Sequence, residues 1–153
     1  MNEHLDFLTR GFFERLQSVP ADSSPLWGKM NLRQMVEHLS DSVRYANGGD
    51  PQTEIVTPAD RLPSVRDFLY SEKEFRPNTR NSKMGEEPAP VRHADLSAAV
   101  DELKAEVEKY VRRFDGRPGH TERSPFFGDL DFDGWNRLFV KHFHHHLRQF
   151  GAA

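Results

Sequence analysis

Two histidines near the end of the chain, His142 and His146, have the type and spacing that suit metal ligation. On an α-helix, residues four apart lie on one face, one turn from each other. Large apolar residues share that face, so both imidazoles are expected in the interior, where a polar partner or a metal ion must replace water. Two imidazoles on neighbouring turns can hold one ion. Their apolar neighbours on this face are Trp135, Phe139 and Phe150.

The pair does not belong to two common helical metal motifs. Zinc proteases need a glutamate directly after the first histidine, and Phe143 stands there instead. Di-iron bundles need a glutamate three residues before the histidine. Met35 precedes His38 in that position, and Phe139 precedes His142. The sequence therefore predicts neither a zinc protease nor a di-iron carboxylate protein.

A pair of imidazoles needs at least one further donor to make a metal site. The candidates are His38, His145, Glu37 and the carboxylates of residues 48–90. His38 is favoured by its residue type and by its place on a predicted long helix. Three neutral imidazoles suit Zn²⁺, Ni²⁺ or Fe²⁺ and leave coordination positions for water or substrate. Spacing alone leaves an alternative open. In it no metal is bound, and the histidines form hydrogen bonds with each other, with Gln149 or with the backbone.

Four long amphipathic segments predict the helices that position these residues. Apolar residues recur every three or four positions in each of them, and no strand pattern is evident. The second segment begins with a capping-box pattern at Asn31 and Gln34. His38 lies on its flank, which can face either a neighbouring helix or solvent. The helices are expected over residues 3–16, 31–46, 95–114 and 131–151, with a short one over residues 63–70.

These elements predict an all-α fold, a four-helix bundle that forms a single domain over residues 1–153. A long crossover, residues 48–90, joins the second and third helices and holds six of the ten prolines. A connection of this length usually wraps a domain or lines a site. We expect Trp27 and Trp135 to anchor the core, with the lining of a pocket as the alternative, and Asp131 to cap the last helix.

Composition restricts the functional classes. The formal net charge is −3, the isoelectric point is about 6.2, and no Lys/Arg cluster alternates with aromatic residues, so nucleic-acid binding is not expected. The N-terminal sequence lacks an apolar signal core and no segment reaches membrane-spanning length, which predicts a cytoplasmic protein without membrane attachment. The chain has no cysteine, which excludes disulfides and a thiolate nucleophile from the protein itself.

Three stretches resemble the DinB-like superfamily, and more narrowly a branch of it catalogued as a domain of unknown function. They are the run WGKMNLRQMVEHL over residues 27–39, the FFG loop over residues 126–128, and Trp135 with KHFHHHLRQFG over residues 141–151. In architecture the resemblance spans nearly the whole chain. It implies a four-helix bundle, often dimeric, with a metal on three histidines, one from the second helix and an HxxxH pair from the fourth.

Matched residue by residue, the resemblance assigns the metal to His38, His142 and His146, the set already favoured by residue chemistry. It implies one divalent ion, with zinc or nickel favoured over iron or manganese, and a homodimer as the oligomer. His144 and His145 fall outside this triad. We expect His144 to lie in solvent and His145 to lie beside the ligands.

The resemblance also implies an activity. Some members of the superfamily are metal-dependent transferases or isomerases that use a low-molecular-weight thiol such as bacillithiol, mycothiol or glutathione. The ion would hold the thiol as thiolate and present it to an electrophilic small-molecule substrate. The alternative is a non-catalytic metal or small-molecule binding module, related to stress. The side chains that could contact an anionic cofactor are Arg33, Arg44, Tyr45, Gln149, Arg76 and Arg80.

Overall fold

Helices make up most of the chain. The computed structural model describes residues 2–77 and 87–152, which are mainly helical with one small sheet, as expected for the all-α class. None of the helices formed by these residues is both long and apolar enough to cross a membrane. The elements are α1 (Glu3–Asp6), η1 (Phe7–Gly11), α2 (Phe12–Leu16), α3 (Leu32–Asn47), η2 (Ala59–Arg61), α4 (Leu62–Leu69), α5 (Leu96–Phe114), β1 (Glu122–Ser124), β2 (Gly128–Leu130) and α6 (Phe132–Gln149).

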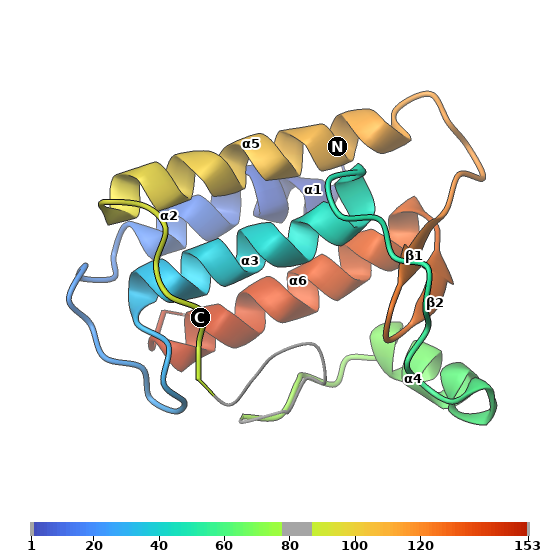
Figure 1. The fold of residues 1–153 in the computed structure, drawn as a ribbon, viewed down its shortest axis with the longest axis horizontal. Helices are drawn as coiled ribbons and strands as arrows, with labels where there is room; N and C mark the ends of the chain where they lie inside the picture. The colour runs from blue at the N-terminus through green and yellow to red at the C-terminus, as the bar shows by residue number, and fades with distance from the viewer. Residues whose placement is uncertain (1, 78–86, 153) are drawn as a thin grey trace.

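The three longest helices lie side by side with the N-terminal helical stretch α1–η1–α2 (Figure 1). α3 and α5 run in the same direction, because the crossover between them returns the chain to the end where α3 began (Figure 1). α6 and the N-terminal stretch run the opposite way. The expected helices over residues 31–46, 63–70, 95–114 and 131–151 are confirmed. The single-domain organisation over residues 1–153 stays a prediction.

Local capping sets where the long helices begin. Asn31 Oδ1 accepts the N–H of Gln34 at 2.7 Å, and Gln34 Oε1 accepts the N–H of Asn31 at 2.9 Å, which completes the expected capping box of α3. Asp95 accepts the N–H of Ala98 at the start of α5. At the start of α6, Asp131 accepts the N–H of Gly134 at 2.9 Å, as predicted. These caps satisfy backbone donors that a helix start would otherwise leave unpaired.

The N-terminal helix differs from the expected uniform α-helix. Residues Phe7–Gly11 form one wider, π-helical turn between α1 and α2. Phe7, the first residue of this turn, stacks on His144 of α6, with the ring centroids 4.1 Å apart and an interplanar angle of 14°. The expectation that His144 lies in solvent is therefore wrong, because its ring is half-buried against Phe7.

A short hairpin between α5 and α6 also departs from the sequence prediction. β1 pairs with β2 in antiparallel register, with Glu122 opposite Leu130 and Ser124 opposite Gly128. Ser124 Oγ accepts the N–H of Phe126 and of Phe127, which holds the turn. Each strand has only three residues, too few for an alternating pattern to stand out in the sequence.

The crossover wraps around the hairpin and then follows α6. The N–H of Val56 donates to the Pro125 carbonyl at 2.7 Å, and Arg66 Nε of α4 donates to the Phe127 carbonyl at 2.8 Å. Farther along the chain, Lys141 Nζ of α6 donates to the Ser71 carbonyl at 2.7 Å. The crossover therefore brings residues 71–77 close to α6, the helix that carries two of the predicted ligands.

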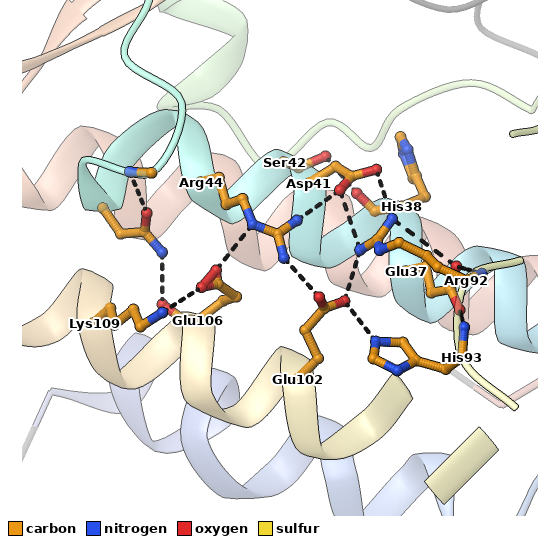
Figure 2. A network of polar contacts seen from close by, with 12 residues as sticks. Glu37, His38, Asp41, Ser42, Arg44, Arg92, His93, Glu102, Glu106 and Lys109 are labelled. Atoms are coloured by element: carbon orange, nitrogen blue, oxygen red, sulfur yellow. Dashed lines mark hydrogen bonds and ion pairs between the residues drawn. The ribbon is translucent and has the colours of Figure 1, made fainter. Parts of the chain in front are cut away.

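A polar seam joins α3 to α5. We use this name for the ion pairs of Arg44, Arg92, Glu102 and Glu106 (Figure 2). Arg44 of α3 pairs with Glu102 at 2.7 Å and with Glu106 at 3.1 Å, both on α5. Arg92, which lies just ahead of α5, pairs with Glu102 at 2.6 Å. Partly exposed ion pairs contribute little stability one by one, so the main effect of the seam is to set how the two helices align.

The core is built from large aromatic and aliphatic side chains. Trp135 of α6 is 1% exposed and its indole N–H donates to the Glu122 carbonyl, so its expected role as a core anchor is confirmed. Tyr110 of α5 is fully buried and donates its hydroxyl to Asn136 Oδ1 at 2.7 Å. Other fully buried large residues are Phe12, Leu32, Met35, Leu39, Leu103, Phe143 and Leu147.

The capping box of α3 yields a stability prediction. Replacing Asn31 by Ala removes the acceptor for the Gln34 N–H and should lower the free energy of unfolding by about 1 kcal/mol. Urea unfolding of the Asn31→Ala variant measures this loss. Ser24→Ala, in the exposed loop ahead of α3, is the control and should leave stability unchanged. Equal stability of the two variants would show that the capping box does not hold the start of α3.

Candidate metal centre

The structure brings His38, His142 and His146 together where α3 lies against α6. Each offers one ring nitrogen, and these three nitrogens lie within 4.8 Å of one another. His142 Nε2 is 3.1 Å from His38 Nε2 and 3.1 Å from His146 Nε2. The residues predicted as a triad from the sequence therefore form one cluster that could hold a metal ion.

Helix geometry explains the cluster. His142 and His146 are one turn apart on the face of α6 that also carries the buried residues Trp135 and Phe139. His38 lies on the flank of α3, where the sequence left its direction open. The packing of α3 against α6 decides this question, because it turns that flank towards His142.

Gln149 determines which nitrogen of His146 carries the proton. Gln149 Nε2 donates to the Trp27 carbonyl at 3.0 Å, so the amide oxygen faces the ring of His146. His146 Nδ1 is 2.8 Å from that oxygen and must carry the proton to donate to it. The lone pair of His146 is therefore on Nε2, the atom that faces His142.

The chemistry of the three facing nitrogens fits a metal ion. A neutral His142 carries at most one proton on Nε2, so this atom can make a well-aligned hydrogen bond to only one of its two neighbours. At the other 3.1 Å contact, no donated proton lies between the two nitrogens, so this contact cannot be a hydrogen bond. A divalent cation in the cluster accepts a lone pair from every ring and removes this conflict.

Burial keeps the triad in the form that binds metal. Desolvation lowers the pKa of His38 to about 4, with a smaller contribution from His145. Desolvation, and then the neighbouring imidazoles, hold the pKa of His142 and that of His146 well below the ordinary value of 6.5. All three rings are therefore neutral at pH 7, and a neutral imidazole is the form that ligates a metal.

Aromatic rings from two loops border the cluster. The ring of His145 lies 5.4 Å from Trp27 and 6.0 Å from Phe75, measured between centroids, and Phe75 lies 6.2 Å from His142. The expectation that His145 lies beside the ligands agrees with its 5.0 Å distance from the His146 ring. Trp27 was expected to be a core anchor, but it is only half-buried and borders the site.

Sequence reasoning missed Phe75 as a neighbour of the cluster. It is a single aromatic residue in the polar stretch SEKEFRPN of the crossover. This isolation was the one feature of the sequence that could have indicated a buried role for Phe75. Its ring packs at 5.3 Å from that of Phe68 in α4. The crossover thus contributes an aromatic wall beside His142, which spacing within a helix could not reveal.

Several other candidates from the sequence have structural roles instead. The Glu37 carboxylate is 3% exposed and accepts the backbone N–H groups of Arg92 at 2.9 Å and His93 at 3.0 Å, so it is not directed at the triad (Figure 2). Arg33 donates to the carbonyl groups of His93 and Ala94. Arg44 belongs to the polar seam. Arg80, another candidate for an anionic cofactor, lies outside the described residues.

Comparison with known sequences places the chain in a family. The family described as "Protein of unknown function (DUF1569)" matches residues 4–152, and the chain belongs to it. No curated protein and no solved structure matches the chain. The match agrees with the expected branch catalogued as a domain of unknown function. Membership of the DinB-like superfamily stays a prediction.

The low pKa values of the triad yield a pH prediction. In the unfolded chain each imidazole takes up a proton near pH 6.5, whereas the folded protein resists protonation until the pH approaches about 4 at His38. The metal-free protein should therefore lose stability as the pH falls below 6.5. The expected loss between pH 6.5 and 5.5 is about 1 kcal/mol for each triad histidine.

Urea unfolding of chelator-treated protein across this pH range measures the loss. His38→Gln should unfold with a shallower dependence on pH, because one of the three groups no longer takes up a proton on unfolding. His4→Gln, which changes a half-buried histidine of α1 outside the triad, is the control and should keep the wild-type dependence. A wild-type stability that is constant between pH 6.5 and 5.5 would contradict neutral burial of the triad.

The bond from His146 to Gln149 yields a second prediction. Gln149→Met keeps the size of the side chain but removes the acceptor that orients His146, and it should weaken metal binding roughly 10- to 100-fold. Titration of the chelator-treated protein with zinc measures the affinity. Gln17→Met, at an exposed position, should bind as the wild type does. Equal affinities would mean that Gln149 does not orient a ligand.

Proposed function

We propose that this member of the DUF1569 family is a DinB-like four-helix bundle that binds one divalent metal ion through His38, His142 and His146. The observation that carries the proposal is the convergence of three neutral Nε2 atoms with too few protons to bond one another. The side-by-side packing of α3, α5, α6 and the N-terminal stretch supports the bundle (Figure 1). The motifs over residues 27–39 and 141–151 support the superfamily.

The donor set favours zinc or nickel, with iron or manganese as further candidates. Imidazole nitrogen is a ligand of intermediate softness that suits these transition metals better than calcium or magnesium. Three protein ligands leave at least one coordination position for another molecule. His38 and His142 are only half-buried, so the cluster is not sealed from solvent. A site of this kind suits catalysis better than a purely structural role.

We propose a metal-dependent transferase that acts on a low-molecular-weight thiol and an electrophilic small molecule. The bound ion would supply Lewis acidity, which stabilises a thiolate at neutral pH. The chain has no cysteine, so the thiol must come from a bound molecule. The protein's own part is to hold the three ligands, to orient His146 through Gln149, and to border the site with the rings of Trp27 and Phe75.

One observation favours the alternative, a non-catalytic metal or small-molecule binding module. Within the described part of the chain, the cluster of metal-binding donors consists of histidines alone and includes no carboxylate. A general base that could take a proton from water or substrate is therefore not evident beside the ion. A thiol bound to a metal loses its proton more readily and has less need of such a base, which is why we favour the transferase.

Elemental analysis of untagged protein tests the metal site. Wild-type protein should carry one equivalent of metal, and His38→Ala and His142→Ala should each lose it. His144→Ala is the matched control, since it changes the same residue type on the same helix outside the triad, and it should keep the metal. Metal-free wild type after reconstitution with zinc, nickel, manganese and iron would refute the proposal.

Thiol conjugation tests the activity once a metal is found. Metal-loaded protein is assayed with glutathione, bacillithiol and mycothiol, each with an aryl halide as electrophile. If the protein is a transferase, we expect turnover in the wild type and in His144→Ala, with complete loss in His142→Ala. Turnover that survives in His142→Ala would exclude a role for the metal. Metal or thiol binding without turnover would favour the binding module.

A further inference from the structure

The side of α6 that faces away from the triad carries several charged side chains. A cavity of about 530 Å³ opens between the N-terminal helices, α6 and residues 69–74. Lys141, His144 and Arg148 are among the α6 residues that line it. Because an α-helix turns by about 100° per residue, these side chains point away from the face that carries the triad. The volume falls within the range of small-molecule sites, roughly 300 to 1,000 Å³.

The cavity is cationic although the chain is acidic overall. Five cationic side chains and two carboxylates line it, a formal excess of three positive charges in a chain with a net charge of −3. Like charges gathered around a concave surface focus the potential there and attract ions of opposite sign. The cations are Arg15, Lys73, Arg137, Lys141 and Arg148, and the carboxylates are Glu72 and Glu74.

Arg148 contributes a hydrogen-bond donor without an acceptor. Its Nη2 atom is buried and has no hydrogen-bond partner among the residues that the structure describes. Its Nε atom lies 3.4 Å from Glu74 Oε2, so Glu74 pairs with the guanidinium group through Nε and leaves Nη2 without an acceptor. Buried guanidinium N–H groups are nearly always paired, and carboxylate or phosphate oxygens are their strongest partners.

Two other cations of the cavity have no carboxylate partner among the described residues. Arg15 makes no ion pair with any carboxylate in the described ranges, and its guanidinium carbon lies 5.6 Å from the centre of the Phe7 ring. Lys141 Nζ donates to the carbonyl groups of Ser71 and Lys73, which are neutral acceptors. The positive charges of Arg15 and Lys141 are therefore not paired with a carboxylate among the described residues, whereas Arg148 keeps one long contact to Glu74.

From these observations we infer that the cavity binds a small anion that carries a phosphate or carboxylate group. Arg148 anchors the anion through its unpartnered N–H group, and Arg15 approaches it from the N-terminal helix. A guanidinium group suits this role because its parallel N–H groups match two oxygens of a phosphate or carboxylate. The site does not include the triad, so it is independent of the metal and of the proposed transferase activity.

Calorimetric titration at low ionic strength tests the inference, with inorganic phosphate and citrate as probes. At least one probe should bind saturably at one site. Arg148→Gln and Arg15→Gln should each weaken that binding by a factor of ten or more. Arg112→Gln is the matched control, because this exposed arginine of α5 lies outside the cavity, and it should bind as the wild type does. Binding of only one probe identifies which anionic group the site prefers.

Two further measurements keep the test independent of folding and of the metal. Thermal unfolding of every variant identifies loss of binding that merely follows loss of structure, and the exposed Arg15 remains a usable probe if Arg148→Gln does not fold. His142→Ala should keep its anion affinity if the site is the cavity. Loss of anion binding in His142→Ala would place the anion at the metal centre and overturn the inference. Equal binding by Arg15→Gln and Arg112→Gln, or no saturable binding of either probe, would also overturn it.

Discussion

The candidate metal centre depends on bringing three imidazoles from two helices to one point. His142 Nε2 lies 3.1 Å from the Nε2 atoms of both His38 and His146, and burial keeps all three rings neutral. This arrangement tolerates little sliding between α3 and α6, because a shift of one helical turn would move His38 by about 5.4 Å past His142 and His146. Several contacts along α3 fix where His38 lies.

The elements around α3 provide that rigidity. The capping box at Asn31 fixes where the helix begins, and Gly48 ends it with a left-handed backbone conformation at φ 88°. The polar seam aligns α3 with α5, and the buried Glu37 carboxylate ties the chain ahead of α5 to the turn that carries His38 (Figure 2). A helix that is fixed at its ends and along its side holds His38 in one place, which is the preorganisation that a binding site needs.

The two sides of α6 carry different chemical groups. One face carries neutral imidazoles beside aromatic rings, and the opposite side carries Lys141 and Arg148 in the cationic cavity. The crossover reaches both sides, because Phe75 packs beside His142 while the residues just before it line the cavity. The proposed metal centre and the proposed anion site would be chemically distinct, since the first needs lone pairs and the second needs hydrogen-bond donors.

The sequence by itself determined the features that depend on neighbours along the chain. Helix periodicity and caps located α3, α5 and α6, and the spacing of His142 and His146 placed them on one face. The tertiary structure alone decided that the flank of His38 faces α6, that Phe75 reaches His142, and that Phe7 covers His144. These contacts join residues far apart in sequence, so they follow from how the helices pack and from the path of the crossover. Neither the packing of the helices nor the path of the crossover produces a periodic pattern in the amino-acid sequence.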